Sequence, residues 1–236
     1  MKRGFTLAEV LITLGIIGVV AAITLSTLIK EYHKHVWVNQ LKANYSILNQ
    51  GFQKMMADDG VNNIEDTEVW RTMQGGCGLY VHEPTSDNCK NFLLHLKKYF
   101  NIVSVKQAGD YKFSYLNNTR KISYYGYPGP GKDIYTINFA NGAMMVYNSF
   151  HNITDRGYIR EVGNFELDIN GHKGPNTYGR DIFIFALDAD GKLYPSGGSN
   201  FPPEFRWTSS CQVGVSSSNG SGCAARIMEN GWKMDY

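Results

Sequence analysis

The sequence predicts an α+β fold in which a long N-terminal α-helix packs on an antiparallel β-sheet. The first observation is an apolar run, Phe5–Ile29, that continues into a helical pattern with no proline or glycine between Ile23 and Asn49. The second is a series of short, aromatic-rich segments after Ile102 that alternate between apolar and polar residues. With 236 residues, the chain is long enough for one or two domains.

The N-terminal helix is expected to cross a membrane. A basic leader, Met1–Gly4, precedes the apolar run, and the run is long enough to span a hydrocarbon core of roughly 30 Å. A cleaved secretory signal fits poorly, because its apolar part has only about 7–15 residues and ends at a small-residue cleavage site. Lys2 and Arg3 place the N-terminus in the cytoplasm and the rest of the chain outside.

Glu9 is the single charged residue of this run and a candidate functional residue. A carboxylate at the centre of a spanning helix costs about 2.5–3.5 kcal/mol, so a cationic partner is expected. A second interpretation is compatible with the first. Thr6-x-x-Glu9 fits a helix N-terminal capping box, in which the carboxylate satisfies backbone donors of the first turn.

The segment Gly4–Ile12 resembles the prepilin processing motif of type IV pilins and type II secretion pseudopilins, and Gly15–Ile23 continues the resemblance. The resemblance implies that prepilin peptidase cuts between Gly4 and Phe5 and N-methylates Phe5. It also implies that Glu9 pairs with the terminal amine of a neighbouring subunit. One residue differs from the family pattern: Ser26 stands where many members carry a proline.

The helix is expected to continue as an amphipathic one over residues 30–58. Apolar residues recur there at steps of three and four, which gives a single stripe. The stripe is shorter than three heptads, which favours packing on the protein's own sheet over a coiled coil. One helix from about Thr6 to about Ala57, ended by Asp58-Asp59-Gly60, is predicted. The stripe comprises Val38, Leu41, Tyr45, Leu48, Phe52 and Met55.

The remaining residues predict a head with one short helix and several strands. The clearest feature is a hairpin at Asn141-Gly142, a pair that favours a type I′ turn. Residues 60–90 are predicted to connect the long helix to this head, and the tail from Pro195 is rich in Gly, Ser and Pro. The predicted elements are a helix at Cys89–Phe100 and strands at Tyr111–Leu116, Lys121–Tyr125, Ile134–Ala140, Ala143–Asn148, Tyr158–Ile169 and Asp181–Leu187.

The four cysteines form two pairs of equal spacing, Cys77 with Cys89 and Cys211 with Cys223. An even number of cysteines in an exported domain favours disulfides, and local pairing is the simplest of three connectivities. Zinc is the alternative, but neither pair has the Cys-x-x-Cys spacing of common zinc sites.

Two C-terminal segments add a second resemblance. Asp168–Asn176 with Gly179–Phe183 resembles a segment of the C-terminal domains of some bacterial pilin-like proteins. Cys223–Ile227 and Gly231–Tyr236 resemble the ends of those proteins. The resemblance implies a β-sheet head and leaves the filament system open.

A calcium site is the one cofactor that the pattern suggests, with Asp168, Asn170 and Asp181 as candidate ligands. Asp168-x-Asn170-Gly171 matches the start of a calcium loop, but the twelfth position lacks the glutamate of an EF-hand. The alternative is a polar turn in which Asp and Asn bind the backbone. The prediction is therefore no required cofactor.

No catalytic motif stands out, so an enzyme is not predicted. Gly126–Lys132 matches most of a phosphate loop, but Asp133 replaces the Ser or Thr that holds magnesium. Aromatic residues between 99 and 150 suggest either a single-strand nucleic-acid platform or, more simply, a sheet packed on a helix. Basic residues are interspersed with these aromatics: Lys106, Lys112, Arg120, Lys121 and Lys132.

The predicted organisation is a leader at 1–4, a transmembrane and assembly helix at 5–29, its amphipathic continuation at 30–58 and an extracytoplasmic head at 59–236. The leading hypothesis is a pilin or pseudopilin subunit of a type IV filament system in the bacterial inner membrane. Expected partners are copies of itself, other pilin-like subunits, prepilin peptidase and an inner-membrane assembly platform. The alternatives are a minor pilin with a DNA- or surface-binding head, a membrane-anchored periplasmic binding module and an anchored enzyme. The charge is nearly balanced, 23 Lys and Arg against 21 Asp and Glu, so nucleic-acid binding is possible but not indicated.

Overall fold

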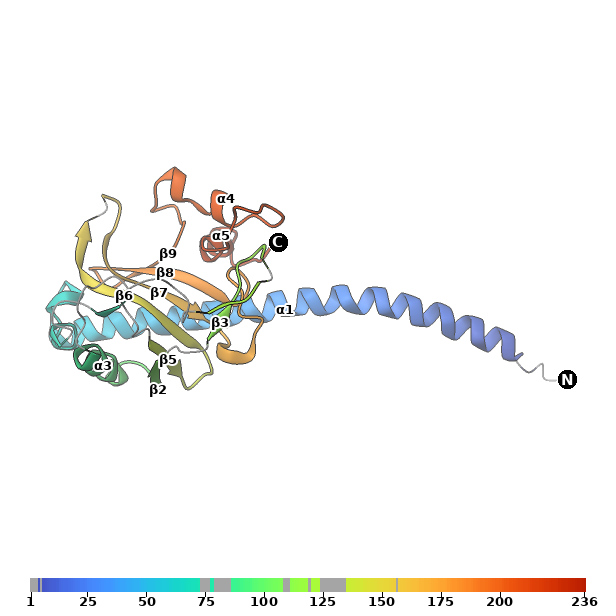
Figure 1. The fold of residues 1–236 in the computed structure, drawn as a ribbon, viewed down its shortest axis with the longest axis horizontal. Coiled ribbons are helices and arrows are strands. Elements are labelled where there is room, and N and C mark those ends of the chain that lie inside the picture. Colours follow the sequence, from blue (N-terminus) through green and yellow to red (C-terminus); the bar gives the residue numbers. More distant parts are fainter. Residues whose placement is uncertain are drawn as a thin grey trace. The chain divides into compact units, whose positions relative to one another are not determined.

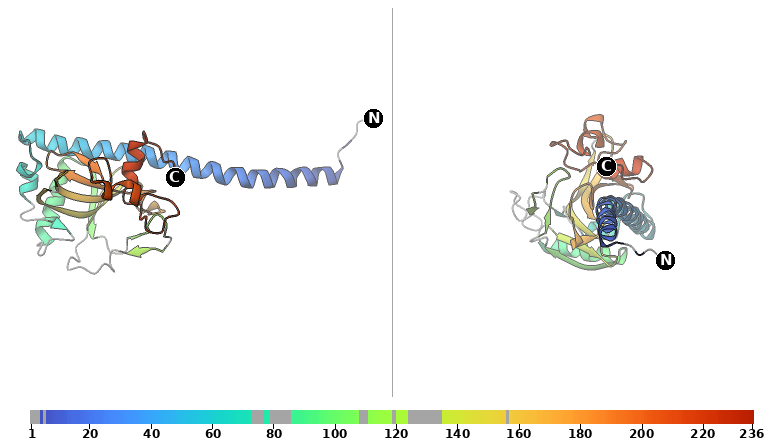
Figure 2. Two further views of the ribbon diagram at one scale, coloured as in Figure 1. Left: turned by 90° about the horizontal axis from the view of Figure 1, so that it is seen from above. Right: turned by 90° about the vertical axis from the view of Figure 1, so that its right-hand side faces the viewer.

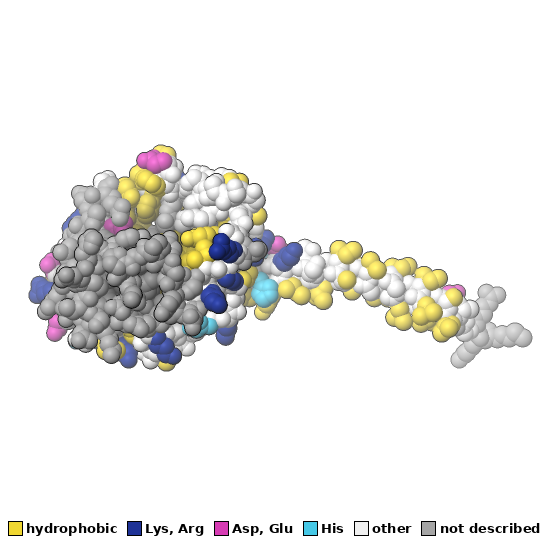
Figure 3. Space-filling model, viewed as in Figure 1, with side chains coloured by type: hydrophobic (Ala, Val, Ile, Leu, Met, Phe, Trp, Pro, Cys, Tyr) yellow, Lys and Arg dark blue, Asp and Glu magenta, His cyan; other side chains and the backbone are white. Residues whose placement is uncertain are grey.

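The computed structural model describes Gly4 and residues 6–72, 77–78, 86–107, 111–118, 120–123, 135–155 and 157–236. It divides the chain into two compact units, Met1–Val36 and Trp37–Tyr236. Both units contain part of one helix, α1, whose residues Leu7–Asp59 confirm the predicted continuous helix. In the first unit the described residues of α1 carry large apolar side chains that are exposed over most of their length (Figure 3).

In the second unit, α1 buries the stripe that its sequence pattern predicts. Leu41, Phe52 and Met55 are completely buried, and Tyr45 is half-buried at the edge of the stripe. The helix ends before Gly60, whose φ of +65° reverses the chain with little steric cost because glycine has no Cβ. Short helical segments follow: η1 at Ile64–Asp66 and α2 at Glu68–Arg71.

The main sheet has the strand order β2-β5-β6-β7-β8-β9. The short strand β1 also pairs with β6, at Ser149 and Phe150, beyond the part of β6 that pairs with β5. All of these pairs are antiparallel. Figures 1 and 2 show the strands side by side across residues 37–59 of α1. The strands are β1 Cys77–Gly78, β2 Ile102–Gln107, β5 Tyr135–Phe139, β6 Met144–Asp155, β7 Arg160–Asp168, β8 Ile182–Asp188 and β9 Leu193–Pro195.

The β5–β6 hairpin exists as predicted, but its turn is not type I′. A type I′ turn needs positive φ at both central residues, and here Gly142 has a φ of +87° while Asn141 does not. The Gly142 N–H donates to the Phe139 carbonyl (3.0 Å), which makes a three-residue loop. The Asn141 side chain accepts from the Ala143 N–H (3.1 Å) and donates to Asn44 of α1 (2.8 Å). With these contacts, Asn141 keeps a negative φ.

The two faces of the sheet are covered by different elements. Residues of one face pack on α1, for example Phe165, which is completely buried. The other face carries Met144 beside Asp168, and Val146 beside Glu166, in the strand register. A small hairpin of β3 (Lys112–Phe113) and β4 (Ile122–Ser123) contributes to a second apolar cluster on this face. Its buried members are Tyr111, Phe113, Met144, Val146, Tyr178 and Ile182.

Helix α3 (Ser86–His95) and the turn η2 (Leu96–Lys98) replace the predicted helix at Cys89–Phe100, with a start three residues earlier. The apolar residues of this segment face the core: Phe92, Leu93, Leu96 and Phe100 are buried. Phe100 lies directly against Gly51 of α1: a Cβ at Gly51 would lie 2.0 Å from a ring carbon of Phe100.

Replacing Gly51 by alanine is therefore expected to destabilise the second unit, by about 1–3 kcal/mol, because overpacking outweighs alanine's better helix propensity. Urea unfolding followed by near-UV circular dichroism measures the change. Ser46→Ala, at an exposed position of the same helix, is the control and should change the free energy of unfolding by less than about 0.5 kcal/mol. Equal or greater stability of Gly51→Ala would show that Phe100 moves aside without loss.

The C-terminal segment contains helices that the sequence analysis did not predict: η5 at Pro203–Phe205, α4 at Trp207–Ser210 and α5 at Cys223–Glu229. A disulfide joins Cys211 to Cys223, which is the predicted pairing, and both residues are completely buried. The side chains of Cys77 and Cys89 lie outside the described part of the structure, so their predicted pairing stays a prediction.

Opening the Cys211–Cys223 disulfide with Cys211→Ser is expected to lower the free energy of unfolding by about 3 kcal/mol, because it frees a loop of about 13 residues. The double variant with Cys223→Ser should lose about the same amount, since either substitution opens the same loop. Thermal unfolding of the three proteins measures this. A double variant as stable as the wild type would contradict the assignment of this bond as a stabilising cross-link.

Candidate functional site

The first turn of α1 forms the predicted capping box. One carboxylate oxygen of Glu9 accepts hydrogen bonds from the Thr6 backbone N–H (2.8 Å) and the Thr6 hydroxyl (2.9 Å). The Glu9 N–H in turn donates to the Thr6 hydroxyl (3.3 Å). Three bonds between the two residues therefore hold the carboxylate at the start of the helix, where the helix dipole favours negative charge.

Glu9 has no ion pair within the part of the chain that the structure describes. Met1–Arg3 and Phe5 lie outside that part, and Gly4 is exposed. The capping box uses one oxygen of the carboxylate, so the second oxygen is available to a donor from outside the helix. The first turn thus offers a positioned carboxylate next to the predicted cleavage point between Gly4 and Phe5.

The helix that follows is long and apolar enough to cross a membrane. Its large apolar side chains are exposed; Leu7 is 79% and Leu28 67% accessible. Gly15 and Gly18 have no neighbouring atoms within 4 Å of an added Cβ. An apolar surface of this extent needs lipid or other helices around it, and glycines permit close helix approach.

The three candidate calcium ligands come together in the second unit, between β7 and β8. The Asp168 carboxylate accepts from the Tyr111 hydroxyl (2.5 Å) and from the Asn170 N–H (3.1 Å). The Asp181 carboxylate accepts from the N–H groups of Asn176 (2.8 Å) and Thr177 (2.7 Å), and more weakly from the Asn170 amide (3.4 Å). Protein donors thus engage both carboxylates, and the described residues contain no cluster of three or more His, Cys, Asp or Glu suited to a metal ion.

This arrangement matches the polar-turn alternative better than a calcium site. Asn170 directs its amide nitrogen toward Asp181 and the Gly174 carbonyl, so it acts as a donor where a calcium ligand would present oxygen. Two carbonyl oxygens of the loop, those of Pro175 and Asn176, accept hydrogen bonds from the Lys121 ammonium. The sequence motif therefore builds a hydrogen-bonded loop between two strands.

Sequence reasoning missed three buried polar side chains near this loop, those of Glu166, Tyr111 and Tyr178. Glu166 is buried and accepts a hydrogen bond from the Tyr178 hydroxyl. Burial raises the pKa of Glu166 to about 7 and that of Asp168 to about 7, and it also raises the pKa of Asp181. The alternation Glu166-x-Asp168 within a predicted strand was an available signal, because it places both carboxyls on one face.

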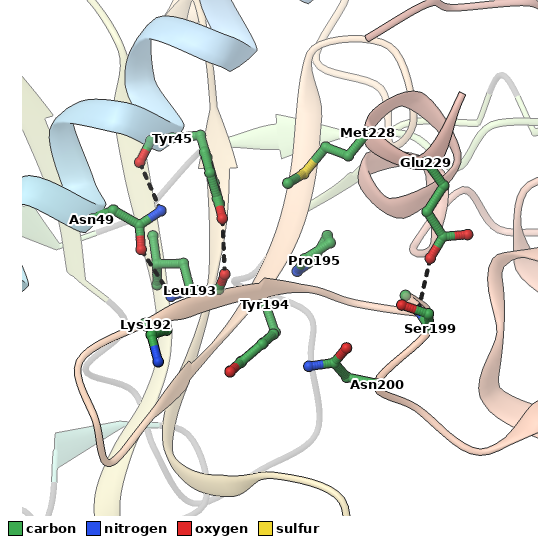
Figure 4. A pocket seen from close by; sticks show the side chains of 11 residues that line it. Tyr45, Asn49, Lys192, Leu193, Tyr194, Pro195, Ser199, Asn200, Met228 and Glu229 are labelled. Carbon is green, nitrogen blue, oxygen red and sulfur yellow. Dashed lines mark hydrogen bonds between the residues drawn. The ribbon is translucent and has the colours of Figure 1, made fainter. Parts of the chain in front are cut away.

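The second unit also contains a cavity of about 340 Å³ between α1, β9 and α5 (Figure 4). Its polar groups are largely used within the protein. The Tyr45 hydroxyl donates to the Leu193 carbonyl (3.2 Å), and the Leu193 N–H donates to Asn49 (3.0 Å). The Glu229 carboxylate accepts from the Ser199 N–H (2.7 Å). The first two bonds attach β9 to α1, and the third attaches the loop after β9 to α5.

The aromatic residues between 99 and 150 do not form an exposed stacking platform among the residues described. Phe100, Phe113 and Phe139 are buried in the two apolar clusters. This favours the simpler prediction of a sheet packed on a helix. The phosphate-loop match at Gly126–Lys132 lies outside the described residues.

Comparison with known families matches residues 1–25 to the prokaryotic N-terminal methylation motif. The comparisons with curated proteins and with solved structures found no significant match. The matched segment contains the leader, the predicted cleavage point, the Thr6–Glu9 capping box and the start of the exposed apolar helix. An α+β fold follows it, with α1 packed on an antiparallel sheet. Residues 1–25 of this chain carry the signature of the type IV pilins and pseudopilins.

Proposed function

We propose that this protein is a structural subunit of a bacterial type IV filament system, such as a type IV pilus or a type II secretion pseudopilus. One observation carries the proposal: the methylation motif coincides with a capped carboxylate, Glu9, at the start of an exposed apolar helix. A cap alone explains neither the length of the apolar surface nor the basic leader before it.

In the proposed pathway, residues 1–4 are a leader and 5–29 anchor the subunit in the inner membrane with its N-terminus in the cytoplasm. Prepilin peptidase hydrolyses the Gly4–Phe5 bond, which leaves a carboxylate on Gly4 and a new amine on Phe5. The peptidase then methylates this amine with a methyl group from a donor molecule. Residues 30–58 continue the helix into the head, 59–236, on the periplasmic or extracellular side.

Assembly then moves the apolar helix from lipid into a bundle of helices from neighbouring subunits. Such a bundle replaces lipid contacts with van der Waals packing and close approach at small residues. The ammonium of Phe5 and the carboxylate of Glu9 attract strongly in this low-dielectric core. The partners are copies of this chain, other pilin-like subunits and an inner-membrane assembly platform. The role is structural rather than catalytic.

The experiment that tests the proposal is substitution of Gly4 by valine, in cells that contain prepilin peptidase. The variant is expected to keep its leader, so its mass exceeds that of the processed protein by residues 1–4. Gly18→Ala, a change at another exposed glycine, is the matched control and should be processed normally. A Gly4→Val variant of the same mass as the wild type would contradict the proposal and favour a plain membrane-anchored binding module.

A further inference from the structure

Two lysines follow the apolar run of α1, and both lie on one face of the helix. Lys30 is exposed, and Lys34 is half-buried one turn later. Residues three and four apart share a helix face, so Thr27 and Ser26 lie on the same side, one turn before Lys30. We call these four residues, Ser26, Thr27, Lys30 and Lys34, the junction stripe. It leads from the end of the apolar surface to the first cations after it.

The length of the apolar run sets the depth of the junction stripe in a membrane. A hydrocarbon core of roughly 30 Å takes about 20 helical residues, so a span that begins at Leu7 ends near Ser26. The headgroup layer adds roughly 5–7 Å on each side. At about 1.5 Å per residue, Lys30 lies about 6 Å beyond Ser26, and Lys34 lies about 12 Å beyond it. The backbone of Lys30 is therefore level with the lipid phosphates, and that of Lys34 lies just outside them.

The side chain of Lys34 points back toward the apolar run. Its ammonium lies 2.9 Å from the carboxylate of Glu31, which is three residues nearer to that run. This direction is the ordinary one, because the Cα–Cβ bonds of a helix tilt toward its N-terminus. Lysines beside a membrane also extend their charged ends to the headgroup level while their methylene groups lie along the apolar surface. Both ammonium groups of the stripe therefore reach the same layer.

The order of chemical groups along α1 indicates what kind of anion fits the stripe. The hydroxyls of Ser26 and Thr27 donate to the Ile23 carbonyl (3.0 and 3.4 Å), so they are satisfied within the helix at the edge of the hydrocarbon. The ammonium groups, which attract anions, follow them. A phospholipid has the same order of acyl chains, uncharged ester groups and then phosphate. Because an anionic lipid carries no cation beside its phosphate, it attracts lysine more strongly than a zwitterionic lipid does.

We propose that Lys30 and Lys34 bind the phosphate of an anionic phospholipid, such as phosphatidylglycerol, at the membrane surface where α1 leaves the bilayer. This binding rests on the membrane anchor of the proposed function, but not on cleavage or assembly. Glu31 competes with the phosphate for the ammonium of Lys34, because the two residues form an ion pair. The bound headgroup fixes the depth at which the membrane holds the subunit, and it must be released before the helix can leave the bilayer.

The test uses the full chain in a non-ionic detergent, with equal amounts of phosphatidylglycerol and phosphatidylcholine that have the same acyl chains. Native mass spectrometry resolves the chain with one lipid of either kind bound, and the ratio of the two adducts gives the lipid preference. A lysine near a membrane surface favours anionic lipid by about fivefold. The wild type should therefore prefer phosphatidylglycerol by about fivefold or more, and K30Q/K34Q should bring the ratio to about one. Glu31→Gln removes the competing carboxylate and should raise the ratio above that of the wild type.

The matched control is K54Q/K97Q, which removes the same charge at two exposed lysines of the second unit. Lys54, like Lys34, forms an ion pair with a carboxylate of α1. The control should keep the wild-type ratio. A wild type without a lipid preference would overturn the proposal, and so would a K30Q/K34Q variant that keeps the wild-type ratio. Equal loss of preference in K30Q/K34Q and the control would also overturn it, because the preference would then follow net charge alone.

The same spectra separate this proposal from the proposed function. When the chain is purified from cells that contain prepilin peptidase, its mass shows whether residues 1–4 have been removed. The adduct ratio shows lipid binding whether or not cleavage has occurred. An uncleaved chain that prefers phosphatidylglycerol would contradict the proposed function alone, and a cleaved chain without the preference would contradict the lipid site alone.

Discussion

Replacing Glu9 by glutamine is expected to abolish incorporation of the protein into fibres while cleavage before Phe5 proceeds. Glutamine has nearly the same shape and can still accept the hydrogen bonds of Thr6, but it carries no charge to attract an ammonium. An ion pair at about 4 Å is worth about 4 kcal/mol at an effective dielectric constant of about 20. The yield of this subunit in sheared or purified fibres should therefore fall by roughly a hundredfold or more. Immunoblots of the fibre and membrane fractions measure it.

Thr6→Val separates this role of Glu9 from its role in the helix cap. Valine keeps the shape of threonine but removes the hydroxyl that bonds to the Glu9 carboxylate and accepts from its N–H. The loss of a cap costs about 1 kcal/mol of helix stability. This cost is small compared with the stability of a helix that spans a lipid bilayer. Thr6→Val should assemble nearly normally. If both variants lose assembly to the same extent, the cap is the essential feature and the pairing of Glu9 with a neighbour's amine is contradicted.

The stability of the second unit is expected to fall as the pH rises from about 4 to about 8. Burial raises the pKa of Glu166 to about 7 and that of Asp168 to about 7 in the folded protein. In the unfolded chain, both carboxyls have their ordinary pKa values near 4. The folded state therefore holds more protons than the unfolded state in this range, so stability is fully present below about pH 4 and is lost as the pH rises through about 7. A shift of roughly three pKa units corresponds to about 4 kcal/mol, so each carboxyl should contribute up to about 4 kcal/mol to this loss.

Urea unfolding at a series of pH values measures the effect, and Glu166→Gln identifies its source. Glutamine can still accept from the Tyr178 hydroxyl, but it has no buried charge to desolvate. The variant is expected to have a flatter pH profile and greater stability than the wild type at pH 8. Glu204→Gln, which removes an exposed carboxyl, should leave the profile unchanged. A wild type whose stability rises steadily from acid to neutral pH would contradict the buried, largely protonated carboxyls.

Much of the fold was predictable because long, regular patterns dominate it. The apolar run and the stripe from Val38 to Met55 gave α1 to within about two residues, since helix periodicity repeats over many turns. The hairpin of β5 and β6 was predictable from Asn141-Gly142, but its turn type was not. The contact of Asn141 with Asn44 of α1 joins residues far apart in the sequence, and it helped to select a different turn.

Shorter elements and the buried polar groups were not predictable in the same way. Helix α5 and strand β9 are too short to show a period, and they depend on a disulfide and on contacts with α1. The carboxyls of Glu166 and Asp168 are ordinary in the sequence. Only the pairing of strands and the cover provided by β3 and β4 bury them. The candidate Thr6–Glu9 cap was predictable because both partners lie in one helical turn.

Mass spectrometry of the N-terminus of the native protein, purified from a cell that contains prepilin peptidase, tests the central claim most directly. The proposed function predicts that residues 1–4 are missing and that the first residue is Phe5 with a methylated amine. An intact Met1, or a chain that begins near residue 29, would contradict it.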